Sequence, residues 1–283
     1  MLASAGHHHS RLRDVFCLCS RAETSRFSMP HSPVFALADL RSQIARLERG
    51  GSERLDRPVL PFGDPRIDTA LPGGGLARSA LHELVGVGPD TEHAAIPTLM
   101  VAAIAGRLSG PVLWAYPRLP PFAPALAAVG LGPERVIYVQ ADQAVLGVIE
   151  DALRVGCLAA VVGEVPGRLS LTASRRLQLA AERAGVMALL LRFSRKHDDP
   201  VLCEPSAALT RWRVGPAPSP PALPHAPDVP GLGRARWRLQ LARVRAGEAR
   251  SWLVDAPDAD GWMVVAGDNA ADRSWPTRYG QTA

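Results

Sequence analysis

A glycine-rich run, Gly86-Val-Gly-Pro-Asp-Thr-Glu-His93, follows a short apolar stretch and is the first segment whose residue types could do chemistry. In a phosphate-binding loop of the form G-x-x-x-x-G-K-[ST], backbone N–H groups hold the phosphates, the lysine reaches them and the hydroxyl holds Mg²⁺. Counting from Gly86 places Glu92 at the lysine position and His93 at the hydroxyl position. Counting from Gly88 places alanine at both. Neither register supplies the required side chains.

Lysine is almost absent from this chain of 283 residues, since Lys196 is the only one. No other segment can therefore supply the lysine of a phosphate-binding loop. Glu92 would also place a negative charge beside a polyanion. We expect no ATP hydrolysis, no bound cofactor and, without paired CxxC motifs or a nucleophile elbow, neither a structural zinc site nor covalent catalysis.

Composition and charge restrict the class of protein further. Hydrophobic residues make up 47% of the chain, the formal net charge is +5, and no apolar run reaches the ~18 residues of a membrane span. The few cysteines favour a reducing cytoplasm. Residues 1–32 have no periodicity, which predicts a disordered or mis-assigned start; Met29 is an alternative initiation site.

Alternation of short apolar runs with helical periodicity predicts an α/β fold with a mostly parallel central sheet flanked by helices. We expect strands at 80–85, 112–116, 136–139, 158–162 and 186–191, and helices at 95–108, 122–129, 142–155 and 170–184. His82 and Glu83 are expected to be polar residues on one face of the first strand rather than catalytic partners, and Cys157 a small core residue.

The C-terminal third lacks the alternation of strands and helices. A strand at 208–214 precedes a proline-rich loop at 216–231, and 232–266 reads as a β-hairpin formed by 236–244 and 250–254, with a last strand at 262–266. Residues 267–283 are expected to be a flexible tail. Alternation along the hairpin predicts Arg236 and Arg238 on one face, opposite Trp237.

An amphipathic helix is predicted at 34–49, within an N-terminal segment at 33–58 that ends in a linker. Its apolar stripe contains Leu37, Leu40, Ile44 and Leu47, spaced three and four residues apart. This stripe either packs on the core of its own chain or docks onto a partner.

Three ordered stretches carry a family resemblance: Leu71-Pro-Gly-Gly-Gly-Leu76, then Val112-Leu-Trp-Ala-Tyr116, then Ala159-Ala-Val-Val162 with Ser174–Glu182 after it. In this order they resemble the core of the RecA family, here residues 59–215. The amino-acid sequence at residues 163–165, 174–182 and 236–238 is most similar to that of the ImuA family, the RecA-like proteins of bacterial mutagenesis cassettes.

This resemblance places the remaining catalytic positions. The family's metal-binding aspartate would fall at Gly163, with Glu164 beside it. Its water-activating glutamate has no counterpart, because no carboxylate occurs between Pro111 and Pro133. The two DNA-contacting loops of the family would carry the basic residues Arg168, Arg175, Arg195 and Lys196, to which the hairpin could add Arg236 and Arg238.

The resemblance implies a non-catalytic accessory protein in SOS-induced, error-prone translesion synthesis. The implied partners are an ImuB-like homologue of Y-family polymerases, an error-prone replicative-type polymerase and, as a further candidate, RecA. Two alternatives stay open: an active RecA-like ATPase, and a cell-division regulator resembling SulA.

Changing Leu40 and Ile44 together to Asp separates the two roles of the N-terminal helix. If the stripe packs on its own core, the melting temperature falls markedly, because each buried apolar side chain stabilises by roughly 1.5–3 kcal/mol. If the stripe docks onto a partner, melting is unchanged and co-purification of the partner is lost. A variant unchanged in both measurements would rule out both roles.

Overall fold

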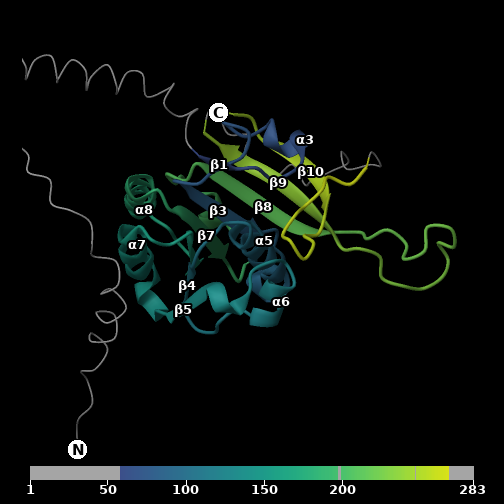
Figure 1. Cartoon of the computed structure of the whole chain (residues 1–283), viewed down its shortest axis with the longest axis horizontal. Coiled ribbons are helices and arrows are strands. Elements are labelled where there is room, and N and C mark those ends of the chain that lie inside the picture. The colour runs from purple at the N-terminus through teal and green to yellow at the C-terminus, as the bar shows by residue number, and fades with distance from the viewer. Residues whose placement is uncertain (1–57, 197–198, 246, 268–283) are drawn as a thin grey trace, which may run out of the picture. The chain divides into compact units, whose positions relative to one another are not determined.

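A computed structural model describes residues 58–196, 199–245 and 247–267 of the chain (Figure 1). The N-terminal helix predicted at 34–49, with Leu37, Leu40, Ile44 and Leu47, lies outside the described residues, as do 1–32 and almost all of the tail at 267–283. Within the described part, no helix is both long and apolar enough to cross a bilayer.

An eight-stranded sheet with the order β10-β9-β8-β3-β7-β6-β4-β5 forms the centre of the fold. Its strands are β3 (Leu81–Gly86), β4 (Val112–Tyr116), β5 (Val136–Gln140), β6 (Ala160–Pro166), β7 (Met187–Phe193), β8 (Thr210–Ala217), β9 (Arg236–Val244) and β10 (Arg250–Asp255). The neighbours from β8 to β5 all pair in parallel, whereas β9 and β10 are antiparallel. The fold is therefore α/β and RecA-like, as predicted.

Helices cover both faces of the sheet (Figure 1). One face carries α5 (Ala95–Gly106) and α6 (Ala123–Ala127), and the other carries α7 (Val145–Val155) and α8 (Leu171–Ala184). Apolar strands buried on both faces read as continuous hydrophobic runs, which is why their positions could be predicted. The strands predicted at 112–116 and 236–244 are found with the same bounds, and the one at 80–85 within one residue.

The antiparallel end of the sheet is covered by a segment from the start of the described chain. This segment contains β1 (Val59–Leu60), α3 (Pro65–Asp68) and β2 (Leu76–Ala77), with β1 and β2 pairing antiparallel. Phe62 lies 5.1 Å from Trp212, and Trp212 lies 6.2 Å from Trp252, between ring centroids. These aromatic rings join strands β8 and β10 to the segment that contains β1, α3 and β2, and all of them share one core.

Three sequence predictions need correction. The strand expected at 262–266 is a single β-bridge between Val265 and Val254, because this segment runs mostly without regular pairing. Cys157 is exposed, since β6 begins only at Ala160 and Cys157 lies in the turn before it. His82 and Glu83 are both fully buried and, as neighbours in a strand, point to opposite faces of the sheet.

Candidate functional site

The loop after β3 lies at the carboxyl end of a central strand, where ligands bind in open α/β sheets. It leads into a single turn of helix, α4 (Asp90–His93), and then into α5. The N–H groups of His93 and Ala94 donate to the carbonyls of Pro89 and Asp90, at 2.9 and 3.1 Å, and the N–H of Asp90 donates to the Ser194 carbonyl at 2.7 Å. These amides are engaged within the protein and do not point together at an empty cradle.

His93 occupies the concave side of the loop. A Cβ atom at Gly88 would overlap the imidazole ring of His93, and one at Gly86 would lie 3.0 Å from the His93 carbonyl oxygen. The side chain of Glu92 is 63% exposed, and its carboxylate lies 3.9 Å from Nε2 of His93. The residue at the lysine position therefore brings a carboxylate rather than a positive charge.

Gly163 and Glu164 lie in the middle of β6, on opposite faces of the sheet. A Cβ atom at Gly163 would overlap the Cδ1 methyl of Ile149, a fully buried side chain of α7. The space that a metal-binding aspartate would need is filled by this helix.

Glu164 turns to the α5 side, where it accepts a hydrogen bond from the indole N–H of Trp114 at 2.9 Å. Burial raises the pKa of the Glu164 carboxyl to about 7, against the lowering effect of the Trp114 hydrogen bond. Below neutral pH the group is therefore mostly a neutral acid, which makes it a poor ligand for Mg²⁺. No group of three metal-ligating side chains occurs within the described residues.

The turn after β4 carries apolar rather than acidic side chains. Pro117 and Arg118 follow the strand, and Leu119 and Phe122 are 80% and 72% exposed. Proline and large apolar groups thus stand where the RecA-family resemblance places the water-activating glutamate.

The predicted basic residues gather toward one edge of the sheet. Arg168 follows β6, Arg195 and Lys196 follow β7, and Arg236 and Arg238 begin β9, opposite Ala217 and Gly215 of β8. Parallel strands end at the same edge, so these side chains lie toward the carboxyl end of the sheet. Arg175, in the second turn of α8, extends the group.

The basic residues differ in their pairing. Arg168 is bonded to Glu204 at 3.0 Å and Arg236 to Asp255 at 3.1 Å. The guanidinium groups of Arg175 and Arg195 are exposed and form no ion pair with another described residue. The structure thus brings the predicted residues to one side of the molecule, and contact with DNA stays a prediction.

Comparison with known proteins gives a clear relationship. The ImuA protein of Caulobacter vibrioides, strain NA1000 / CB15N, is 40% identical over 216 residues, which cover 73% of this chain and 86% of the relative. The ImuA protein of strain CB 15 matches to the same extent. The chain belongs to the ImuA family. No protein-family model matches it.

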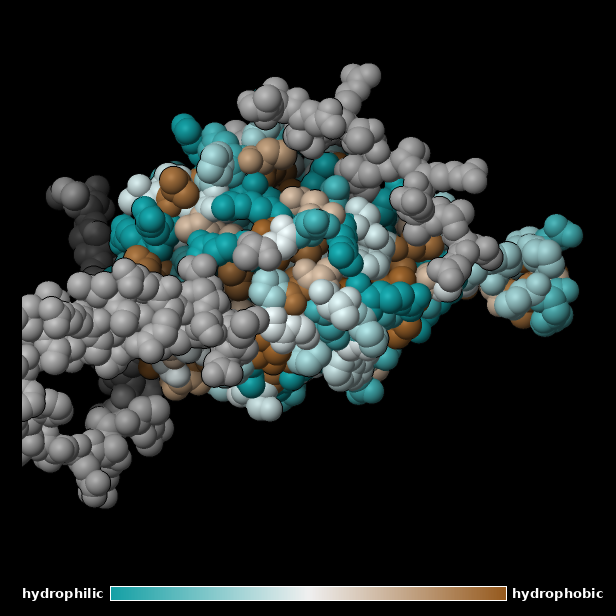
Figure 2. All heavy atoms as spheres, turned by 90° about the horizontal axis from the view of Figure 1, so that it is seen from above, coloured by the Kyte–Doolittle hydropathy of each residue, from teal (hydrophilic) through white to brown (hydrophobic). Residues whose placement is uncertain are grey.

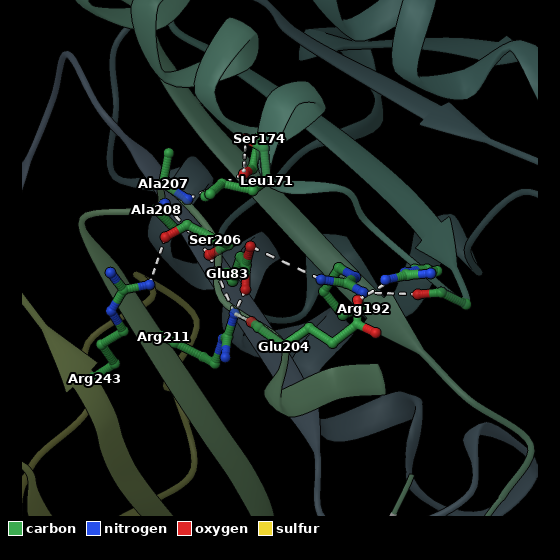
Figure 3. A network of polar contacts seen from close by, with 12 residues as sticks. Glu83, Leu171, Ser174, Arg192, Glu204, Ser206, Ala207, Ala208, Arg211 and Arg243 are labelled. Atoms are coloured by element: carbon green, nitrogen blue, oxygen red, sulfur yellow. Dashed lines mark hydrogen bonds and ion pairs between the residues drawn. The ribbon is translucent and has the colours of Figure 1, made fainter. Parts of the chain in front are cut away.

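A buried ionic cluster underlies the basic edge of this ImuA-family protein (Figure 3). The carboxylate of Glu83, on β3, accepts from Arg211 of β8 at 2.7 Å and lies 3.8 Å from the guanidinium of Arg192, on β7. All three side chains are less than one-tenth exposed. The single carboxylate offsets part of the charge of the two guanidinium groups, and hydrogen bonds from both arginines to backbone carbonyls stabilise them further.

The same two arginines form hydrogen bonds to the loops after β6 and β7. Arg192 donates to the carbonyl of Gly167 at 2.7 Å, and Arg211 donates to the carbonyl of Glu204 at 2.7 Å and to Ser206 at 3.1 Å. These contacts position the loops after β6 and β7, which carry Arg168, Arg195 and Lys196. Sequence reasoning missed this cluster; an arginine ending the apolar run 186–191 was the available signal.

His82 has a structural role in a chain of hydrogen bonds. The indole of Trp212 donates to the Thr210 hydroxyl at 2.9 Å, that oxygen lies 2.7 Å from His82 Nδ1, and His82 Nε2 lies 2.9 Å from the Ala77 carbonyl. Because a carbonyl only accepts, Nε2 carries the proton and Nδ1 accepts from Thr210. Burial lowers the pKa of His82 to about 4, so the ring stays neutral at physiological pH.

Replacing Gly163 with Asp is expected to destabilise the fold by about 2–4 kcal/mol, because the new side chain overlaps Ile149 and buries a carboxylate against apolar groups. Urea unfolding measures the loss. The matched control is Gly147→Asp, since Gly147 is exposed on the same helix as Ile149 and a Cβ there has no neighbour within 4 Å. Equal stability of the two variants would show that α7 moves aside easily.

Proposed function

We propose that this protein is a non-catalytic, RecA-like accessory factor in SOS-induced, error-prone translesion DNA synthesis in the cytoplasm. Membership in the ImuA family supports this, because that family is encoded in mutagenesis cassettes. The proposed partners are the ImuB-like homologue of Y-family polymerases and the error-prone replicative-type polymerase of the cassette, with RecA as a further partner. The protein would act by holding these components together.

The closed state of the loop after β3 is the observation that carries the non-catalytic part of the proposal. Catalysis of phosphoryl transfer depends on a lysine, a metal ion and donors that converge on the phosphates. Here several amides of the loop donate to protein carbonyls, His93 lies against Gly88, and Ile149 fills the space beside Gly163. Each of the three requirements meets a separate structural obstacle.

Weak contact with DNA is part of the same proposal. Exposed Arg175, Arg195 and Lys196 on one side of the molecule favour attraction to phosphates, an attraction that falls as salt rises. Acidic residues such as Glu204 already neutralise part of this edge. We therefore assign DNA a secondary role beside protein partners.

Titration with ATP and Mg²⁺ in a calorimeter should detect no binding tighter than millimolar. The double variant Glu92→Lys/His93→Thr is the informative comparison, because it supplies the missing lysine and hydroxyl and removes the imidazole ring from the loop. It should gain little affinity while the loop amides remain bonded to Pro89 and Asp90. A micromolar site in the unaltered protein would favour the active ATPase instead.

Co-purification from DNA-damaged cells, followed by mass spectrometry, should recover the ImuB-like subunit with this chain. Recovery of that subunit supports an accessory role in translesion synthesis. Recovery of cell-division proteins without any polymerase subunit would instead favour the SulA-like regulator.

A further inference from the structure

The connection between β8 and β9 projects from the body of the molecule as a narrow arm, residues 218–235 (Figure 1; the lobe at the right of Figure 2). Almost every residue in it is exposed or half-buried. The two strands it joins are adjacent and antiparallel, so a turn of a few residues would have sufficed. The extra length therefore calls for a reason other than chain connection.

Prolines recur in the arm at every third position, at 218, 221, 224, 227 and 230. Two of them begin successive turns of the backbone. The N–H of Ala226 donates to the Leu223 carbonyl at 3.0 Å across Pro224, and the N–H of Val229 donates to the Ala226 carbonyl at 3.1 Å across Pro227. Proline is favoured at the second position of such turns because its φ is already set. The tip of the arm is thus a repeated, restricted turn.

Two glycines let the returning limb lie against the outgoing one. A Cβ atom at Gly231 would lie 2.7 Å from the Ala222 methyl, and one at Gly233 would overlap the Pro220 carbonyl oxygen. Side chains at these positions would force the limbs apart. The arm is therefore a built two-limbed element with a defined tip.

Large apolar side chains are displayed on this element rather than covered. Leu223, Val229 and Leu232 are 41%, 47% and 97% exposed. The ionisable side chains of the arm are His225, Asp228 and Arg234. With one formal positive and one formal negative charge among them, the arm offers no electrostatic attraction to a polyanion. Its chemistry suits an apolar protein surface.

We propose that residues 218–235 form a docking arm that inserts into an apolar groove of the ImuB-like subunit. The turns at the tip restrict the backbone before binding, so the arm loses little entropy on association. A narrow protruding element requires a concave receptor, and Leu223, Val229 and Leu232 supply the area that the groove removes from water. The inference rests on the function proposed above, since it takes its partner from there.

The test measures the affinity of the purified full-length chain for the purified ImuB-like subunit by biolayer interferometry. The triple variant Leu223→Ser/Val229→Ser/Leu232→Ser should bind at least about tenfold more weakly, the equivalent of about 1.4 kcal/mol. Its melting temperature should not change, because these side chains do not pack in the core. The control His225→Ala/Asp228→Ala, on the same tip, should bind within about twofold of the parent chain.

A second variant, Pro224→Ala/Pro227→Ala, keeps the apolar side chains and frees the backbone of the tip. It should weaken binding by a smaller factor, because ordering the arm then costs more entropy on association. Loss of affinity in the triple variant with little change in the control supports the docking arm.

The remaining outcomes are decisive in different ways. If the parent chain binds the subunit and the triple variant binds equally well, the arm proposal is overturned and the accessory function stands. If the parent chain does not bind, the partnership itself fails and the arm proposal falls with it. If light scattering shows that the triple variant dissociates a dimer while its subunit affinity is retained, the arm belongs to a second copy of this chain, which also overturns the proposal.

Discussion

One buried carboxylate organises the centre of this sheet. Glu83 lies on the central strand between β7 and β8, and each of these strands contributes an arginine to it. An unpaired interior charge costs several kcal/mol, so the carboxylate stabilises both arginines in their buried positions. Arg192 and Arg211 in turn hold the backbone at Gly167 and Glu204, and Arg243 of β9 bonds the carbonyl of Ser206. The surface loops of the molecule therefore depend on an interaction that lies beneath them.

The loop after β3 has the position that a RecA-like fold predicts, but its amides contact the protein itself. The loop after β3 occupies the expected place at the centre of the sheet, and its amides are bonded to neighbouring carbonyls, one of them Ser194 at the end of β7. Val87 packs over Gly215 of β8, which ties the loop to the antiparallel end as well. The loop that binds a ligand in nucleotide-binding proteins here connects β3 to β7 and β8 through contacts within the protein.

Much of the fold could be predicted because buried parallel strands are short, apolar and separated by helices. Val112–Tyr116 was recognisable for this reason, and the two-residue period placed Arg236 and Arg238 opposite Trp237. Features that depend on long-range contacts could not be predicted. Glu83 and Arg211 are 128 residues apart, and nothing local to either indicates their pairing. The strand expected at 262–266 is only a bridge to Val254 of β10, because apolar composition does not reveal how many residues of a segment pair with a neighbouring strand.

The candidate site also combines features that the sequence predicted with features that only the structure shows. The absent lysine and carboxylates were visible in the sequence because a motif is a local pattern. The position of His93 over Gly88 and of Ile149 beside Gly163 depends on how α4 and α7 pack, which only the structure gives. The apolar display on the arm also needed the structure, since a proline-rich stretch alone is typical of a linker.

The contact between Ile149 and Gly163 makes these two positions depend on each other. A Cβ atom at Gly163 would overlap the Ile149 side chain, so only glycine fits in β6 here while isoleucine stands at 149. An aspartate at 163 would therefore need a second substitution that shortens Ile149. The residue that one position tolerates is set by the residue present at the other, and the two substitutions together should not have additive effects on stability.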